Sequence, residues 1–463
     1  MPKINEVKLG VLAGQKNYRA LRAALSELND VDVAQFIEDL PEEQAILTFR
    51  TLHKEQAMEV FAELDGDTQQ FIVEAISDRE LGDLMDELSV DDAVDMLEEM
   101  PAQVVKRVLQ NASPETRVLI NDFLRYPEYS AGSIMTAEFT DLKQGMTVED
   151  AIKRIRRRGE DRETIYTCYV IDDTRRLEGV VTVKDLLLAQ DNERVENLME
   201  TDVKSVQTTE DQEEAAAMMT KYGFMALPVV DAENRLVGIV TVDDAMDVIQ
   251  EEATEDFEKM AAMAPSEKPY LKTGVFSLAK NRILWLLVLM VSGMISGGIL
   301  GGFEEILTTI PILVTFIPML TDTSGNAGSQ SSTLVIRGMA LGQIVLSDAA
   351  AVFWKELRVS LMVGIPLAAI NFLRVVIFTP GSYLEGLTVS LAMVFTVILA
   401  NGIGGLLPMA AKRLKIDPAV MATPLITTIC DALSLIIYLA STMVLLPKVA
   451  LSITMVPGME ACS

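Results

Sequence analysis

An apolar stretch near the end of the chain, residues 418–446, is long enough to cross a lipid bilayer as a single helix. It nevertheless places Thr427, Asp431 and Ser434 at membrane depth. Because a carboxylate in hydrocarbon is costly, Asp431 is expected to face a water-filled path with a cation to balance it, and it is the first candidate for an ion site. The alternative is a protonated Asp431 bonded to a neighbouring helix.

The charge of the chain changes abruptly near residue 270. Residues 1–270 contain 58 Asp and Glu against 28 Lys and Arg, a net charge of −30, and residues 271–463 contain 9 against 11, a net charge of +2, which together give −28. A very acidic half is therefore joined to an apolar half that is nearly neutral. Such acidity argues against a nucleic-acid partner, because phosphates would be repelled, and it favours a cation.

Cysteine and histidine usage indicates the compartment and limits the metal chemistry. Cys168, Cys430 and Cys462 have no paired spacing, and the N-terminal residues contain no apolar core of a signal peptide. The acidic half is therefore expected in a reducing cytosol. With His53 as the single histidine, the sequence argues against a histidine-based zinc site.

The first 130 residues contain a repeat of 12 residues. Each unit ends on an apolar residue, which is followed by a residue that commonly begins a helix. The apolar positions are Leu28, Leu40, Leu52, Leu64, Ile76, Leu88, Met100 and Ala112. Helices of about two turns are unstable alone, so this region is predicted to stack into an α-helical superhelix.

A second repeat occupies residues 131–243, in which Gly179 and Gly238 stand at equivalent positions. Each copy alternates helical stretches with two predicted strands, residues 166–171 and 180–183 in the first copy and 226–230 and 239–242 in the second. Each copy also contains a T-x-x-D element, which ends at Asp185 or at Asp244. Such an element is also an ordinary helix-capping box.

Two acidic segments are unusual because their like charges recur one helical turn apart. In SVDDAVDMLEEM these are Asp91 and Asp95. In the long helix predicted after the second repeat they are Asp244, Asp247, Glu251, Glu255 and Glu258. Divalent cations bound through oxygen would draw such elements together, and repulsion would separate them when the ions leave, as a gate requires. The alternative is a plain acidic linker helix.

Five apolar spans are expected in the second half: 283–300, 310–340 with an interruption, 359–378, 387–411 and 418–446. The interruption is the polar sequence TDTSGNAGSQSS, which either borders a path through the membrane or marks the end of the second span at Leu320. Lys and Arg cluster before the first span and after the second and fourth, which predicts a cytosolic N-terminus.

Longer motifs make the chain resemble the MgtE family of magnesium channels and transporters. They are EEATEDFEKM, GFEEIL, SGNAGSQSS and DPAVMATPLITTICDALS, and the repeat of residues 131–243 resembles a tandem pair of cystathionine-β-synthase (CBS) domains. The resemblance extends essentially from end to end. The expected fold is multidomain: an α-helical superhelical N-domain (1–130), α/β tandem CBS domains (131–243), an acidic connecting helix (244–270) and a five-helix α transmembrane domain (271–463).

The resemblance also implies site residues and a homodimer whose pore is lined by the second and fifth spans. The pore site of the family corresponds to Asp431 and the backbone carbonyl of Thr427, and its inner and outer mouths correspond to Asp417 and Glu304. The cytosolic Mg²⁺ sensor of the family corresponds to Asp91, Asp95, Asp211, Glu213, Asp244, Asp247, Glu252, Glu255 and Asp256. In CBS domains the T-x-x-D element often holds a ribose, so Asp185 and Asp244 are candidates to bind ATP or another adenine nucleotide.

The expected function is Mg²⁺ uptake across the cell (inner) membrane through a multi-pass protein that cytosolic Mg²⁺ closes. The chain is not expected to be an enzyme, and no Walker-type glycine loop is present. A cation exchanger coupled to H⁺ or Na⁺, and a non-transporting membrane sensor of Mg²⁺ or nucleotide, are the alternatives. Selectivity among Mg²⁺, Co²⁺, Mn²⁺ and Ca²⁺ does not follow from a carboxylate and a carbonyl alone.

Overall fold

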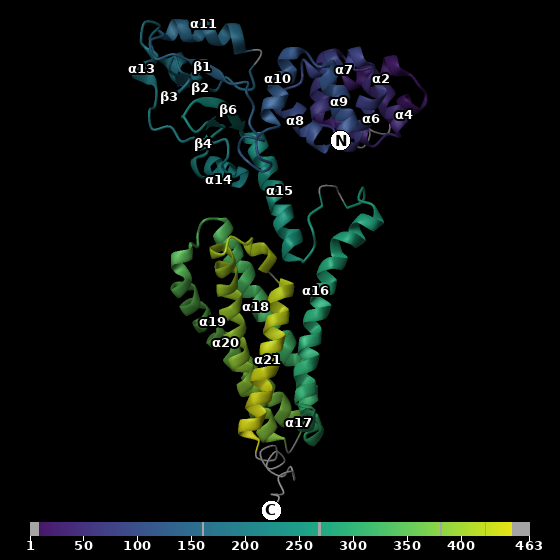
Figure 1. Cartoon of the computed structure of the whole chain (residues 1–463), viewed down its shortest axis with the longest axis vertical. Helices are drawn as coiled ribbons and strands as arrows, with labels where there is room; N and C mark the ends of the chain where they lie inside the picture. The colour runs from purple at the N-terminus through teal and green to yellow at the C-terminus, as the bar shows by residue number, and fades with distance from the viewer. Residues whose placement is uncertain (1–8, 160–161, 267–269, 380–381, 422, 447–463) are drawn as a thin grey trace, which may run out of the picture. The chain divides into compact units, whose positions relative to one another are not determined.

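The computed structural model of the chain describes residues 9–159, 162–266, 270–379, 382–421 and 423–446. It divides into two compact units, Met1–Ile249 and Gln250–Ser463 (Figure 1). The first unit contains the acidic helical array and the repeated α/β region. The second contains the long apolar helices. Each unit is described by itself.

The first part of unit one is an array of short helices whose period agrees with the repeat of 12 residues. The helices are α2 (Tyr18–Leu25), α3 (Asp30–Glu38), α4 (Glu42–Phe49), α5 (Lys54–Ala62), α6 (Gly66–Ala75), α7 (Asp78–Met85), α8 (Val90–Glu99), α9 (Ala102–Asn111) and α10 (Pro114–Phe123). Side chains that begin helices do so as expected: Asp65 accepts a hydrogen bond from the Thr68 N–H at 2.7 Å, and Ser77 forms a capping box with Glu80.

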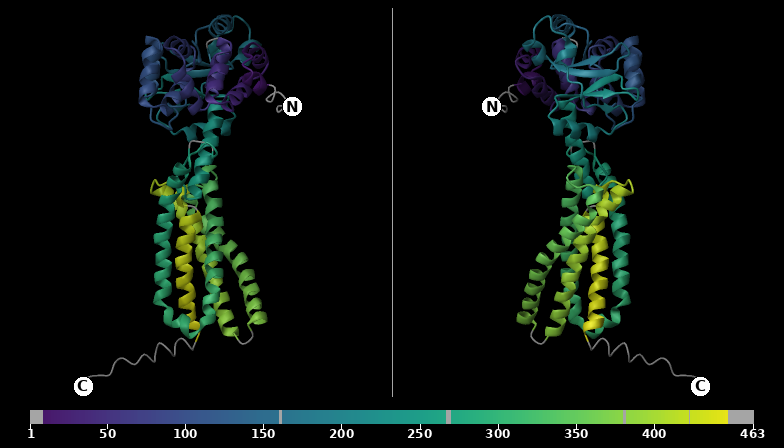
Figure 2. Two further views of the ribbon diagram at one scale, coloured as in Figure 1. Left: turned by 90° about the vertical axis from the view of Figure 1, so that its right-hand side faces the viewer. Right: turned by 90° about the vertical axis from the view of Figure 1, so that its left-hand side faces the viewer.

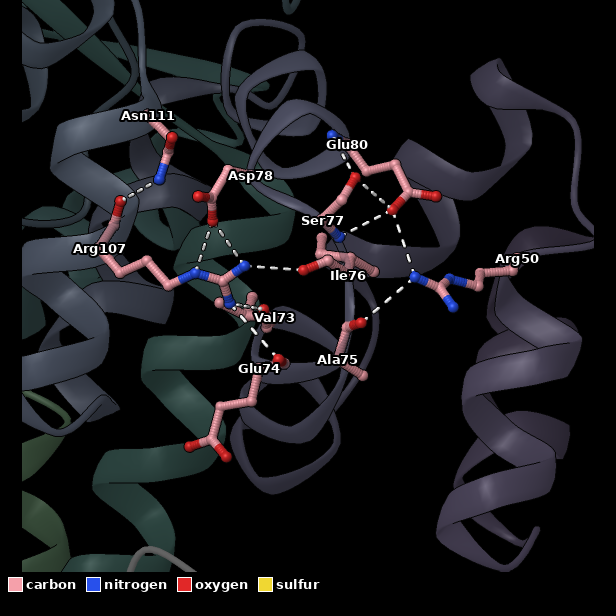
Figure 3. A network of polar contacts seen from close by, with 10 residues as sticks. All are labelled: Arg50, Val73, Glu74, Ala75, Ile76, Ser77, Asp78, Glu80, Arg107 and Asn111. Carbon is pink, nitrogen blue, oxygen red and sulfur yellow. Dashed lines mark hydrogen bonds and ion pairs between the residues drawn. The ribbon is translucent and has the colours of Figure 1, made fainter.

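Arginine side chains join successive helices of this array by binding carbonyl groups at helix ends. Arg107 of α9 donates to the carbonyls of Val73 and Ile76, each at 2.7 Å, where α6 ends, and it also pairs with Asp78 (Figure 3). The last carbonyls of a helix have no partner within the helix. Arg107 therefore satisfies groups that the short helix leaves open and links α9 to α6.

The repeated α/β region contains two three-stranded sheets of the same topology. Their strands are β1 (Thr140–Leu142), β2 (Thr167–Ile171), β3 (Leu177–Thr182), β4 (Val206–Gln207), β5 (Ala226–Val230) and β6 (Leu236–Thr241). In each sheet the central strand pairs in parallel with the strand before it and antiparallel with the strand after it. The register shifts at equivalent positions, between Val170 and Ile171 and between Val229 and Val230, which confirms the internal repeat.

Helices complete each copy of the repeat. They are α11 (Val148–Arg158), α12 (Val183–Leu188), α13 (Val195–Leu198) and α14 (Gln212–Tyr222). The long helix α15 (Val242–Met260) follows β6 directly and crosses the boundary between the two units in the sequence. Its position agrees with the acidic connecting helix expected from the sequence.

The second unit consists of long helices that run alongside one another (Figure 2). They are α16 (Val275–Gly302), α18 (Ile317–Ala340), α19 (Ala349–Phe378), α20 (Tyr383–Arg413) and α21 (Thr423–Leu445), with short elements α17 (Glu304–Thr309), η2 (Pro311–Phe316), η3 (Leu346–Asp348) and η4 (Pro418–Met421) between them. Within the described ranges, 4 helical stretches are long and apolar enough to cross a membrane, namely Val275–Gly302, Leu346–Phe378, Tyr383–Arg413 and Pro418–Leu445.

The second expected span, which corresponds to α18, is long enough to cross a membrane but too polar to qualify by composition. It has 24 residues and is continuous from Ile317 to Ala340, so both expectations about its polar sequence, an interruption and an end at Leu320, are wrong. The reason is local satisfaction of the polar groups: Ser324 donates to the Thr321 carbonyl at 2.9 Å, and Ser331 donates to the Asn401 carbonyl of α20 at 3.1 Å. Small residues thus let α18 pack closely against its neighbours.

Candidate functional site

The candidate pore site centres on Asp431, in the interior of α21. Its Oδ1 atom is inaccessible to solvent and accepts no hydrogen bond from any residue that the structure describes. Ser434 is buried and donates its hydroxyl to the main-chain carbonyl of Asp431 at 2.8 Å, so it does not engage the carboxylate. A buried oxygen without a donor is costly, which marks Asp431 as a position that a ligand would complete.

The second helix of this site, α18, approaches α21 where it carries no side chain. A methyl group added to Gly325 would lie 2.7 Å from Thr427 Cγ2 and 3.5 Å from Asp431 Oδ1. Nearby, the hydroxyls of Ser329 and Thr427 are 3.3 Å apart. The structure therefore brings the two sequence-predicted pore residues against α18. Gly325 itself was missed, although its setting in the motif SGNAGSQSS was the available signal.

An oxygen-rich face continues along α18 beside this point. Asn326 donates its amide to Asp322 Oδ1 at 3.1 Å. Asp322, Asn326 and Gln330 follow one another at helical spacing, and their side chains are exposed on this unit. Carboxylate, amide and hydroxyl oxygens are ligands that suit a hard cation or its hydration shell, and they do not suit a soft metal.

A second candidate site lies on α8 and α15, both within unit one up to residue 249. Asp91 is 9% exposed, and its Oδ1 accepts no hydrogen bond among the described residues. Asp244 accepts a hydrogen bond from the Thr241 hydroxyl. The structure thus places carboxylates that the sequence predicted for a cation sensor, from two separate helices, in one electrostatic neighbourhood.

The pKa values of these carboxyls record the crowding. Burial, together with the charges of Asp91, Asp92, Glu98 and Asp244, raises the pKa of Asp95 to about 8. Part of the Asp95 side chain is accessible to solvent, yet the surrounding protein restricts its hydration. Burial and the charges of Asp91 and Asp243 raise the pKa of Asp244 to about 7, although its bond to Thr241 acts in the opposite direction.

Acidic residues that the sequence prediction did not include also belong to this neighbourhood. Burial raises the pKa of Asp92 to about 6, and burial with the charges of Asp91, Asp243 and Asp244 raises that of Glu163 to about 7. Glu63, which follows the last residue of α5, and the exposed Asp247 have raised pKa values, chiefly from restricted hydration, and the charge of Asp247 also helps to raise the pKa of Glu63. Their clustering depends on contacts between elements distant in sequence.

These carboxylates do not form a closed metal cage. Over the described residues, no three carboxylate, imidazole or thiolate groups converge closely enough to hold an ion directly. Mg²⁺ usually keeps several waters and binds one or two carboxylates, so an open acidic neighbourhood fits hydrated Mg²⁺ better than it fits zinc. The unbonded Oδ1 of Asp91 is consistent with such a ligand.

Other predicted ligands have local structural roles. Asp211 caps α14 by accepting the Glu213 N–H at 2.9 Å. Asp185 and Thr182 form a capping box at the start of α12, which was the structural alternative for the T-x-x-D element. Glu304 is an exposed residue at the start of α17, and Glu252 lies half-buried on α15.

The end of α15 meets the segment before α21 in unit two. Lys259 Nζ lies 2.7 Å from Glu255 Oε1 and 2.8 Å from Asp417 Oδ2. Asp256 is half-buried, and its pKa is raised by burial and by the charge of Asp417. Two carboxylates that the sequence predicted for cations, Glu255 and Asp417, are therefore paired with a lysine of the chain itself.

Comparison with known proteins matches each region of the chain to a family. Residues 317–441 match MgtE, described as a divalent cation transporter, and residues 28–129 match the MgtE intracellular N domain. Residues 131–192 and 195–251 each match the CBS domain. The matches cover most of the helical array, the repeated α/β region and the helices from α18 to α21.

Curated relatives and solved structures agree with these matches. The chain is 38% identical over 436 residues to the magnesium transporter MgtE of Thermus thermophilus, covering 93% of this chain and 96% of the relative, and 32% identical over 432 residues to that of Bacillus subtilis, covering 93% and 95%. The cytosolic domain of the Mg²⁺ channel MgtE in complex with ATP is 38% identical, with a TM-score of 0.50, and covers 52% of this chain and 99% of its own. The soluble part of a magnesium transporter is 28% identical, with a TM-score of 0.51, and covers 55% and 100%. The acidic helical array, the CBS pair and the apolar helices around Asp431 thus belong to a multi-pass membrane protein of the MgtE family of divalent cation transporters.

Proposed function

We propose that this chain is a Mg²⁺-selective channel for magnesium uptake, which works as a homodimer in the cell membrane with its N-terminus in the cytosol. The observation that carries the proposal is the Asp431 carboxylate, which lies in the interior of a membrane-length helix with an oxygen that no described residue satisfies. A carboxylate there raises the local concentration of cations and holds them through their hydration water.

Permeation requires no energy source other than the membrane potential. A divalent cation that moves inward gains roughly 4.6 kcal/mol per 100 mV, twice the value for a single charge. Asp431 attracts the ion through an oxygen that no described residue satisfies, and the bare backbone at Gly325 lets α18 come close to the carboxylate and to Thr427. At this level α18 and α21 are in close contact, so a hydrated ion would pass only when the two helices separate here.

The gate acts through the acidic residues of α8, α15 and the CBS pair. Mg²⁺ bound among them would neutralise their charge and bridge the elements that carry them. When ionised and without a bridging ion, these carboxylates repel one another. After burial, the charges of Asp91 and Asp244 help to raise the pKa of Asp95, and the charge of Asp91 helps to raise that of Asp244. We infer that repulsion separates these elements at low cytosolic Mg²⁺ and that the channel conducts in that state.

The test is Mg²⁺ flux into liposomes that contain the purified full-length protein. Wild-type protein is expected to conduct at micromolar Mg²⁺ on the cytosolic face and to be suppressed at millimolar Mg²⁺. Asp431→Asn is expected to reduce flux at least tenfold, whereas Glu385→Gln, which removes a carboxylate at the start of α20, should leave it unchanged. Equal flux for wild type and Asp431→Asn would contradict the pore assignment.

The same experiment separates the alternatives. Flux that follows a pH or Na⁺ gradient at fixed voltage would indicate a coupled exchanger. No flux at any Mg²⁺ concentration, combined with Mg²⁺-dependent protection of residues 9–159 against proteases, would indicate a sensor. Flux that ignores cytosolic Mg²⁺ would support the pore and contradict the gate.

We further propose that the CBS pair binds an adenine nucleotide. A solved relative with 38% identity is a complex with ATP, which supports this proposal. In this chain Asp185 also closes a capping box, so its carboxylate would serve two purposes. Calorimetric titration of the full-length protein with ATP is expected to give saturable binding that Asp185→Ala weakens. Equal affinity in the variant would contradict the role of Asp185.

A further inference from the structure

The end of α15 carries a cation of its own at the place where divalent cations were expected. The ammonium of Lys259 lies 2.7 Å from Glu255, one turn earlier on the same helix, and 2.8 Å from Asp417, which immediately precedes η4 and α21. The Lys259 side chain is 24% exposed, so both ion pairs are partly shielded from water. Lys259 thus joins α15 to the segment that leads into the helix of Asp431.

Each carboxylate oxygen of Asp417 has a partner within the chain. Its Oδ1 accepts the Ala419 N–H at 2.8 Å, which fixes the turn at the start of η4, and its Oδ2 faces the Lys259 ammonium. A divalent ion that bound Asp417 and Glu255 together would compete with that ammonium for the same carboxylates. Two positive charges would then replace one between the same two carboxylates.

The surrounding charges favour a permanent ammonium. Burial lowers the pKa of Lys259, but its hydrogen bonds to Asp417 and Glu255 and the charges of those residues raise it overall. Asp256, next to Glu255, adds a third acidic group, and Arg337 at the end of α18 adds a positive charge whose influence reaches Asp256. The excess of carboxylates at this point therefore has a partial counter-charge within the chain.

We propose that Lys259 is a built-in cation that fastens the end of α15 to the start of the fifth span without Mg²⁺ and competes with Mg²⁺ for Glu255 and Asp417. The proposal rests on the proposed gate for its effect on flux. Its structural part, a latch independent of Mg²⁺, stands without it. Lys259 acts as a positioning residue and sets how much Mg²⁺ is needed to hold the connecting helix.

Loss of the Lys259 ammonium has two opposite consequences. Together they distinguish a lysine that competes with Mg²⁺ from a lysine that only stabilises the fold. Without Mg²⁺, Glu255 and Asp417 repel each other, so the end of α15 is held less firmly. With Mg²⁺, both carboxylates are available, so the ion binds more tightly. Partly exposed ion pairs have modest strength, which corresponds to a change of about two- to fivefold in each equilibrium.

The decisive measurement is hydrogen exchange of the amides of residues 250–260 in the full-length protein, first in EDTA and then over a Mg²⁺ titration. In EDTA, the amides of Lys259→Met are expected to exchange about two- to fivefold faster than those of wild type. Added Mg²⁺ should restore wild-type protection in the variant, and its half-maximal effect should occur at a lower Mg²⁺ concentration than in wild type. Lys259→Arg should behave like wild type. Lys280→Met removes an exposed lysine of the same unit and should change nothing.

Two results would overturn the proposal. Unchanged exchange of Lys259→Met in EDTA would mean that the ion pairs do not hold the helix. Faster exchange that Mg²⁺ does not reverse would mean that Lys259 only supports the fold. Because exchange is read without transport, a wild-type protein that conducts no Mg²⁺ would contradict the proposed function and leave this test intact. In a conducting protein, Lys259→Met should also raise flux at low Mg²⁺ and lower the half-inhibitory concentration.

Discussion

At the scale of single residues, the candidate pore site depends on the Asp431 carboxylate and on the bare backbone of Gly325 beside it. Asp431 could be predicted because a carboxylate within an apolar span is conspicuous without any knowledge of packing. Gly325 and Lys259 could not, because their roles depend on which helices meet: Gly325 faces Thr427, and Lys259 faces Asp417. Asp185 shows the converse, since the capping alternative read from its spacing is present in the structure.

Gly325→Ala tests the close approach of α18 to the pore carboxylate. The added methyl would lie 2.7 Å from Thr427 Cγ2, closer than van der Waals contact, so α18 and α21 must move apart or Thr427 must turn. Overpacking of this kind costs about 1 to 3 kcal/mol. Liposome flux is expected to fall several-fold, while Gly298→Ala in α16, where an added methyl has no neighbour within 4 Å, should leave flux unchanged. Normal flux in Gly325→Ala would show that the space beside Asp431 is not limiting.

Tyr438→Phe tests a tie between α21 and the segment that leads into α18. The fully buried Tyr438 hydroxyl donates to the Leu313 carbonyl of η2 at 2.9 Å. Its loss leaves a buried carbonyl without a donor and should lower stability by about 1 to 2 kcal/mol. Thermal unfolding in detergent should show a lower melting temperature, while the exposed control Tyr383→Phe should melt like wild type. Equal melting of both variants would contradict a stabilising role for this bond.

At the scale of elements, periodicity and capping predicted the helical array and the repeated sheets. The polar composition of α18 led to the wrong prediction of a break or an end at Leu320, because α18 is one continuous helix. The repeat of 12 residues carries helix starters such as Ser77 and Asp65, so element boundaries followed from local chemistry. The polar sequence of α18 has no such signal, because its helicity depends on packing. Ser331 reaches Asn401 of α20, and a methyl added at Gly328 would lie 3.2 Å from the Ala400 carbonyl.

Arg107→Ala tests whether arginine side chains hold successive helices of the array together. Arg107 satisfies the carbonyls of Val73 and Ile76 and pairs with Asp78 (Figure 3), so its removal should cost about 2 kcal/mol locally. Amides of α6 should exchange with solvent more than tenfold faster in the variant. Lys106→Ala, which changes an exposed neighbour on the same helix, is the control. Unaltered exchange in α6 would mean that water replaces the arginine at no cost.

At the scale of the whole molecule, an acidic half is joined to a nearly neutral membrane half, and the proposed sensitivity to cations rests on this asymmetry. Residues 1–270 carry a net charge of −30, yet only some of their carboxyls are crowded. The charge balance predicted a cation ligand from composition alone. That Glu63 and Glu163 join the predicted Asp244 could not be predicted, because the three residues lie far apart in the sequence.

The crowding predicts how stability depends on pH when Mg²⁺ is absent. The folded-state pKa values of Asp92, Asp244 and Asp95, about 6, 7 and 8, lie above the value of about 3.9 expected for an unfolded aspartate. The folded protein therefore binds more protons than the unfolded chain between these limits. The stability contributed by their protonated forms is complete below about pH 3.9 and is lost as pH rises through about 6 to 8.

In EDTA, the first unfolding transition of the full-length protein in scanning calorimetry should therefore move to lower temperature as pH is raised from about 5.5 to 8.5. Saturating Mg²⁺ should weaken this dependence of the transition temperature on pH. Bound ions offset the repulsion among the ionised carboxylates, which protonation removes at lower pH. The double variant Asp95→Asn/Asp244→Asn cannot titrate at these positions, so its transition temperature in EDTA should change less with pH. The control is Asp39→Asn, which replaces an exposed residue at the end of α3 and should keep the pH dependence of wild type. A transition temperature in EDTA that rises with pH would contradict this prediction. It would mean that the protein itself stabilises these carboxylates in their ionised form, so that they need no cation.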